Sequence, residues 1–244
     1  MVQAQRPSLI RLYQLKDGYC YNSDSLFLFA FAKSFLKRGM RVLDVGCGSG
    51  ILGALCLRDF ACELEMIEKD PANAFLAKLN VAEAILHCGD FLDFRTEKKF
   101  DLVISNPPFY RGEILPSKNE RLNLARNERS MPLESMLKSV KRALKPNGKF
   151  VFCYDAKEAH RVFYALRESG LNAEVARFVH PRESQNATLI MICAKIQSKK
   201  SLQILPPLLT HIGLEQMDNS SEVREIYWEC NTYSIKVEAK DIGF

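Results

Sequence analysis

The sequence contains no long apolar run, and this absence excludes one class of protein. A helix that spans a bilayer needs roughly 18–20 consecutive apolar residues, and the richest apolar stretch here, residues 26–32, is far shorter. The N-terminus also lacks a basic patch followed by a long apolar segment, so no signal peptide is predicted. We therefore expect a cytoplasmic protein that has no membrane partner.

Paired cysteines are absent as well, although the chain has eight cysteines. They are scattered singly, no Cys-x-x-Cys pair occurs, and none of the four histidines stands at the spacing of a metal ligand. This pattern argues against a disulfide framework and against a zinc site, so we predict no metal. Buried free thiols in a reducing compartment fit the pattern better.

Charged residues are distributed unevenly along the chain of 244 residues, whose net charge is +5. Residues 1–110 are balanced, residues 111–149 carry +6, residues 150–200 carry +3 and residues 201–244 carry −4. A basic segment of this kind suits a polyanionic substrate. A solvated loop and helix face would explain it equally well, so the charge distribution alone leaves both interpretations open.

Strand-like and helix-like segments alternate from residue 40 to about residue 195. Such alternation is typical of an α/β fold with a mostly parallel sheet and helices on its faces. In that architecture, ligands bind at the carboxyl ends of the strands. We expect strands at 41–45, 64–67, 85–88, 102–105, 149–154, 174–179 and 188–194. We expect helices at 51–60, 71–81 and 133–144, and a further helix that follows the strand 149–154 and ends at residue 167.

The two ends of the chain carry weaker signals. Residues 9–15 and 19–22 flank Lys16-Asp17-Gly18, which predicts a β-hairpin. Asn22-Ser23-Asp24 then predicts the cap of an apolar helix. The chain thus divides into an N-terminal hairpin and helix over 1–39, a core over 40–197, and a C-terminal extension of unclear structure over 198–244, packed on the same domain.

Three glycines join the first strand of the core to its first helix, in the segment Asp44-Val-Gly-Cys-Gly-Ser-Gly50. Glycine lets the backbone adopt positive φ and approach a ligand without an intervening Cβ. The third glycine comes one residue too early for the G-x-G-x-x-G dinucleotide pattern, and the Asp44 carboxylate suits an ammonium group better than a pyrophosphate. Glu68 and Asp90, at the next two strand ends, are placed to accept from ribose hydroxyls and from an adenine amine. We therefore predict a nucleoside cofactor.

Asn106-Pro-Pro-Phe109 follows the next apolar strand. The two prolines fix φ and remove two backbone donors. The backbone carbonyls and the amide oxygen of Asn106 are then available to accept hydrogen bonds from a planar amine, and Phe109 offers a face on which a base can stack. A rigid loop would explain the tetrapeptide by itself, but its position beside the predicted cofactor site favours a substrate site.

Together these motifs resemble the class I S-adenosylmethionine-dependent methyltransferases over residues 40–195. The resemblance implies a Rossmann-like, seven-stranded sheet with S-adenosylmethionine as the cofactor. Asn106-Pro-Pro-Phe109 is similar to the (Asp/Asn/Ser)-Pro-Pro-(Tyr/Phe/Trp) motif of enzymes that methylate a conjugated nitrogen, which implies catalytic roles for Asn106, Pro107 and Phe109. The implied cofactor contacts are Asn22, Ser23, Asp24, Ser25, Asp44, Gly46, Cys47, Gly48, Gly50, Glu68, Lys69, Asp90, Phe91 and Asn106.

Two further segments narrow the substrate. Residues 17–28 and the stretch Ala125-Arg126-Asn127-Glu128 resemble the bacterial tRNA1(Val) (adenine-N6)-methyltransferase family. This resemblance implies methylation of adenine N6 in tRNA, at the adenosine 3′ of the anticodon. The basic segment offers candidates for contacts with RNA phosphates: Arg111, Lys118, Arg121, Arg126 and Arg129.

Other substrates fit the same motif. Similar sequences occur in enzymes that methylate guanine N2 of ribosomal RNA, a glutamine amide of release factors, or DNA adenine. The basic segment favours nucleic acid over a protein loop. A binding module that keeps the fold without catalysis is the alternative from another class, and the acidic residues at successive strand ends argue against it.

Overall fold

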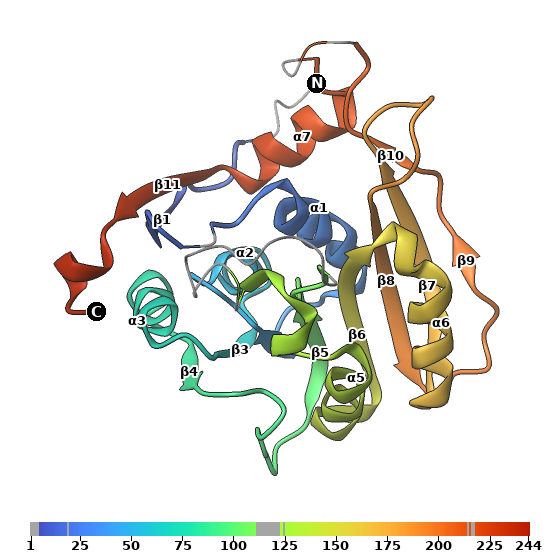
Figure 1. The fold of residues 1–244 in the computed structure, drawn as a ribbon, viewed down its shortest axis with the longest axis horizontal. Coiled ribbons are helices and arrows are strands. Elements are labelled where there is room, and N and C mark those ends of the chain that lie inside the picture. Colours follow the sequence, from blue (N-terminus) through green and yellow to red (C-terminus); the bar gives the residue numbers. More distant parts are fainter. Residues whose placement is uncertain (1–4, 19, 111–122, 124, 214, 216–217) are drawn as a thin grey trace.

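A mixed β-sheet forms the centre of the computed structural model (Figure 1), which describes residues 5–18, 20–110, 123, 125–213, 215 and 218–244. Its strands are β2 (Arg41–Val45), β3 (Glu63–Glu68), β4 (Ile85–Cys88), β5 (Phe100–Ser105), β6 (Leu144–Asp155), β7 (Leu171–His180), β8 (Leu189–Ile196), β9 (Gln203–Ile204) and β10 (Leu208–Leu209). Their order is β10-β7-β8-β6-β5-β2-β3-β4, and β9 also pairs with β7. Among the described strands of this sheet, only β8 runs antiparallel to its neighbours. The predicted seven-stranded, mostly parallel sheet is confirmed, and two short strands extend it beyond β7.

Helices cover both faces of the sheet (Figure 1). The buried side chains accordingly form two large clusters, and the pleat of β2 divides them, because Val42 belongs to one cluster and Leu43 to the other. The helices of the first face are α1 (Ser23–Ala32), α2 (Ile51–Phe60) and α3 (Pro71–Asn80), and those of the second face are α5 (Leu133–Ala143) and α6 (Ala159–Glu168). Four large apolar residues of α5 recur with helical spacing and are fully buried: Leu133, Met136, Leu137 and Val140.

The predicted N-terminal hairpin is wrong for the residues that the structure describes. β1 (Ile10–Leu15) pairs in parallel with β11 (Thr232–Val237), and the two form a separate sheet. The predicted turn does form, because the Gly18 N–H donates to the Leu15 carbonyl at 3.4 Å. Beyond the turn, however, the chain enters α1, so the partner of β1 comes from the C-terminal extension.

The C-terminal extension lies against the core. Its helix α7 (Ser221–Cys230) buries one face in the cluster that includes α1. The Arg58 guanidinium of α2 donates to the carbonyls of Ser8, Glu229 and Cys230, which ties both ends of the chain to the same helix. No helix in the described part of the chain has the length and apolar character to cross a bilayer. Short 3-10 helices occur at Lys33–Phe35, Glu128–Ser130, Ala156–Glu158 and Ala239–Ile242.

Candidate active site

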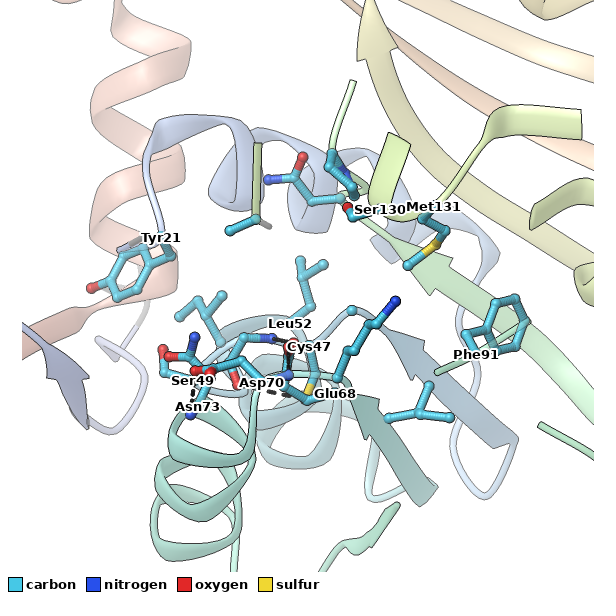
Figure 2. Close-up of a pocket in the computed structure, with 18 of the residues that line it drawn as sticks. Tyr21, Cys47, Ser49, Leu52, Glu68, Asp70, Asn73, Phe91, Ser130 and Met131 are labelled. Atoms are coloured by element: carbon cyan, nitrogen blue, oxygen red, sulfur yellow. Dashed lines mark hydrogen bonds between the residues drawn. The ribbon is translucent and has the colours of Figure 1, made fainter. Parts of the chain in front are cut away.

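An open cleft of about 920 Å³ lies at the carboxyl ends of β2, β3, β4 and β5. In Figure 2, Tyr21 lies on one side of the hollow and Phe91 on the other, with Met131 above and Glu68 below. Many of the predicted cofactor residues line the cleft: Ser25, Gly46, Cys47, Gly48, Glu68, Lys69, Asp90, Phe91 and Asn106.

The loop after β2 forms one wall of the cleft. Gly46, Gly48 and Gly50 all have positive φ, at 65°, 54° and 90°. The N–H groups of Gly46 and Cys47 donate to the Ile67 carbonyl at 2.9 and 3.1 Å, which ties the loop to the end of β3. A Cβ on Gly48 would meet no atom within 4 Å, so this glycine faces open space. Gly50 packs against the core instead, since a Cβ there would approach a side-chain atom at 3.2 Å.

The Glu68 carboxylate is held by two backbone N–H groups. Its Oε2 accepts from Gly48 at 2.8 Å, and its Oε1 accepts from Asp70 at 2.8 Å. Each oxygen keeps capacity for a further hydrogen bond. Burial raises the pKa of Glu68, and the backbone hydrogen bonds oppose this rise. An oriented carboxylate at the end of β3 is a suitable acceptor for two ribose hydroxyls.

Asp44 is fully buried beside the glycine loop. Its Oδ2 accepts from the Gly53 N–H at 2.9 Å, whereas its Oδ1 has no hydrogen-bond partner in the described part of the chain. Burial raises the pKa of Asp44 to about 7, the Gly53 bond opposes this rise, and the nearby charge of Glu68 adds to it. This unpartnered oxygen and the neighbouring Glu68 carboxylate suit a ligand with positive charge, but Asp44 itself is not among the residues that line the cleft.

The predicted adenine contact, Asp90, already has two partners. Its Oδ1 accepts from the Leu92 N–H at 2.9 Å, and its Oδ2 accepts from Lys69 Nζ at 2.7 Å. Phe91, which follows it, is 2% exposed and stacks on Phe94 at a centroid distance of 6.3 Å. The cleft therefore has an apolar wall with an acidic group at its edge, which fits a flat ring that carries an amine.

The Asn106 carboxamide lies where β5 ends and is held from two sides. Its Nδ2 donates to Ser25 Oγ of α1 at 3.1 Å, and its Oδ1 accepts from the Cys153 thiol of β6 at 3.1 Å. Pro107 is buried, and Pro108 lines the cleft in its place. The amide that sequence reasoning selected is thus in the same cleft as the glycine loop.

The ring of Phe109 does not lie open to a base. Its ring packs against Tyr154 at a centroid distance of 5.6 Å and against Tyr110 at 5.2 Å. It is half-buried, packs against both large core clusters and is not among the residues that line the cleft. Tyr110 is 46% exposed, so it presents the more accessible ring next to the tetrapeptide.

The N-terminal residues predicted to contact the cofactor have two different roles in the structure. Ser25 lines the cleft, whereas Asn22 is the N-cap of α1, since its Oδ1 accepts from the Asp24 N–H at 3.1 Å. Asn22 Nδ2 also donates to the Asp24 carboxylate at 2.9 Å. Asn22 and Ser23 line a neighbouring hollow, to which Tyr21 also contributes.

Two of the predicted RNA contacts can be placed. Arg126 and Arg129 are exposed. The Tyr110 N–H donates to the Arg126 carbonyl at 3.0 Å, and the Glu128 N–H donates to the Tyr110 carbonyl at 3.1 Å. The middle of the basic segment is therefore hydrogen-bonded directly to the residue that follows the tetrapeptide. The other three predicted contacts lie outside the described residues: Arg111, Lys118 and Arg121.

A buried ion pair anchors the same region. Glu128 is 6% exposed, and the Arg161 guanidinium of α6 donates to both of its carboxylate oxygens, at 3.1 and 2.6 Å. Arg161 also donates to the Glu134 carboxylate at 2.8 Å. This pair holds the chain beside the candidate substrate site. In the sequence, Glu128 stood out only as part of a motif, and Arg161 was not predicted as a site residue.

Several cleft residues were not predicted from the sequence. Asp70 and Asn73 had a recognisable signal, because Asp70 caps α3 just before Pro71 and its side chain accepts from the Asn73 N–H at 3.0 Å. Ser130 and Met131 had none. Within the described residues, no group of three or more His, Cys, Asp or Glu side chains could hold a metal ion. The other unpredicted lining residues are Tyr21, Ser49, Ile51, Leu52, Ile67, Gly89, Pro108 and Ala125.

Comparison with known proteins adds independent findings. A family model described as the methyltransferase small domain matches residues 22–176. A tRNA1(Val) (adenine(37)-N6)-methyltransferase of Dyadobacter fermentans is 27% identical over 177 residues, which cover 69% of this chain and 73% of that protein. One of Pedobacter heparinus is 27% identical over 180 residues, covering 70% of this chain and 75% of that protein. Among solved structures, a predicted O-methyltransferase from Agrobacterium tumefaciens has a TM-score of 0.63 at 18% identity, covering 88% of this chain and 100% of that one. The last likeness is one of fold.

Proposed function

The chain belongs to the methyltransferase small domain family, and from this premise we propose that it methylates N6 of adenine in tRNA with S-adenosylmethionine as donor. The target is the adenosine 3′ of the anticodon, in keeping with the names of the two relatives. One observation carries the proposal. The Asn106 carboxamide shares a cleft with the glycine loop and Glu68, so a target amine held there lies beside the cofactor site.

The residues of the cleft fit S-adenosylmethionine. Open space at Gly48 leaves room for the ligand beside the loop. The oriented Glu68 carboxylate would accept the ribose hydroxyls, and Asp44 and Glu68 together supply negative charge for the ammonium and sulfonium groups. Phe91 and Asp90 would bind the adenine. When bound, the cofactor supplies an electrophilic methyl group.

The chain itself contributes alignment of the target amine. The lone pair of an exocyclic amine is delocalised into the ring, so the nitrogen is a poor nucleophile. Hydrogen bonds from its two N–H groups to Asn106 Oδ1 and to the Pro107 carbonyl would favour a tetrahedral nitrogen and localise the lone pair. Catalysis of this kind depends on orientation and on stronger binding of the transition state. The N–H proton becomes acidic as the methyl group transfers, so no strong base is needed.

The base must leave its stack to reach Asn106. Phe109 or the exposed ring of Tyr110 would then stack on it. Arg126 and Arg129, next to the tetrapeptide through the backbone bonds of Tyr110, would contact phosphates. Binding should therefore weaken as salt rises.

Labelled methyl transfer to an unmodified tRNA transcript tests the proposal. Purified protein should produce N6-methyladenosine, detected by nucleoside mass spectrometry, and a transcript with guanosine in place of the adenosine 3′ of the anticodon should remain unlabelled. Asn106→Ala should abolish turnover and still bind S-adenosylmethionine in calorimetry. Total RNA, total protein and DNA serve as parallel acceptors. Label appearing as N2-methylguanosine, in DNA or on a protein glutamine, with none in tRNA, would overturn the assignment of the substrate.

A further inference from the structure

The orientation of the Asn106 amide matters for the proposed reaction. Only the oxygen can accept from a target amine, while the nitrogen of the same amide is a donor. A rotation of 180° about the last side-chain bond would exchange the two atoms and leave a donor facing another donor. Some neighbouring group must therefore select one orientation.

Ser25 cannot make this selection. Its hydroxyl can donate or accept, so it can pair with either end of the amide across the observed 3.1 Å. Asn106 otherwise lies at the end of β5 with a partly exposed side chain. The hydrogen bond with α1 fixes where the amide lies but leaves open which end is which.

The Cys153 thiol does distinguish the two ends. It lies 3.1 Å from Asn106 Oδ1 and is fully buried in β6. A thiol donates and accepts only weakly, and the structure pairs this sulfur with the oxygen of the amide and not with its nitrogen. Burial raises the pKa of Cys153 well above its usual value, and the charge of Asp24 adds to this, so the sulfur keeps its proton.

We propose that Cys153 is a positioning residue, whose thiol donates to Asn106 Oδ1 and thereby fixes the amide in the orientation that accepts a substrate amine. The second lone pair of Asn106 Oδ1 is then available to accept a hydrogen bond from the target amine. Ser25 and Cys153 form a clamp that joins α1 and β6 through the catalytic amide. The inference rests on the proposed function for its catalytic consequence, although the orientation of the amide is a property of the protein alone.

Two substitutions separate the hydrogen bond from packing. Cys153→Val keeps an apolar side chain of similar size and removes the donor, whereas Cys153→Ser keeps a donor. We expect Cys153→Val to lower kcat about five- to tenfold, the usual worth of one hydrogen bond, with KM for RNA and cofactor affinity unchanged. Cys153→Ser should retain most of the wild-type kcat. Cys193→Val is the matched control, because Cys193 is equally buried in the neighbouring strand β8 and has no bond to Asn106.

A second readout needs no substrate. In wild-type protein labelled with ¹⁵N-asparagine, the Asn106 side-chain N–H groups should exchange slowly with solvent, because the amide is clamped. Exchange should be faster in Cys153→Val and close to the wild-type rate in Cys153→Ser and Cys193→Val. If wild-type protein methylates no RNA but this exchange pattern appears, the proposed function fails and the role of Cys153 stands. Unchanged exchange in Cys153→Val, or equal loss of kcat in the Val and Ser variants at equal thermal stability, would overturn the role of Cys153.

Discussion

Replacement of Asp44 by asparagine tests how the buried acid is used. The pKa of Asp44 is raised from 3.8 to about 7, chiefly by burial. Between these values the folded state keeps a proton that the unfolded chain has lost. The contribution of Asp44 to the free energy of unfolding is therefore fully present below pH 3.8, and it is lost progressively as the pH rises through 7. At about 1.4 kcal/mol per pH unit the total loss is about 4 kcal/mol, of which about 3 kcal/mol falls between pH 5 and pH 8.

The asparagine introduced by Asp44→Asn cannot ionise, and its amide oxygen can still accept from the Gly53 N–H. In urea denaturation without cofactor, Asp44→Asn should gain about 3 kcal/mol over wild type as the pH rises from 5 to 8, which corresponds to roughly 6–12 °C in Tm. The exposed Asp93 provides the control, since Asp93→Asn makes the same change of side chain at the surface of the protein. The same Asp44→Asn variant should bind S-adenosylmethionine more weakly, because the ligand's cationic groups lose an acidic partner. Parallel stability curves for wild type and Asp44→Asn across this range would refute the reasoning.

Two other acids, Glu68 and Glu128, lead to further predictions. Glu68→Gln should lower the affinity for S-adenosylmethionine by about tenfold in calorimetry, because the amide nitrogen of the glutamine would face one of the two backbone N–H groups that now donate to the carboxylate. An unchanged dissociation constant would contradict the role of Glu68. Arg161→Met should lower the free energy of unfolding by about 3–5 kcal/mol, because it removes the guanidinium from which both oxygens of the buried Glu128 carboxylate accept. Adding Glu128→Gln to that variant should recover part of the loss in urea denaturation, and no recovery would speak against the lost charge pairing as the cause.

The half of the site assigned to the cofactor was predictable because its parts are local. A strand, a glycine loop and a helix follow one another around Gly46–Gly50, and Glu68 and Asp90 each stand at or just after the end of a strand. In a parallel sheet such ends meet at one edge, so the order of the strands suffices to bring the groups together. The cap of α3 by Asp70 has the same local character.

The pairing of the chain ends was not predictable from neighbouring residues. Lys16-Asp17-Gly18 predicted a hairpin, and the turn forms, but β1 pairs with a strand that begins at Thr232. A parallel pair needs no tight turn between its strands, so it leaves no turn signature in the sequence. The sequence pattern after residue 198 is weak, so the partner strand β11 was not predicted either.

The half of the site assigned to the substrate is assembled from distant segments, and this explains why its chemistry was easier to infer than its geometry. Asn106 could be identified from its tetrapeptide, yet the groups that hold it come from α1 and from β6. Phe109 was expected to face a base, but its ring packs against the buried Tyr154 of β6. The type of side chain determines what a group can bind, whereas its orientation depends on neighbours that the fold supplies. Substitutions at such neighbours, Cys153 above all, should therefore alter turnover while leaving the recognisable motif intact.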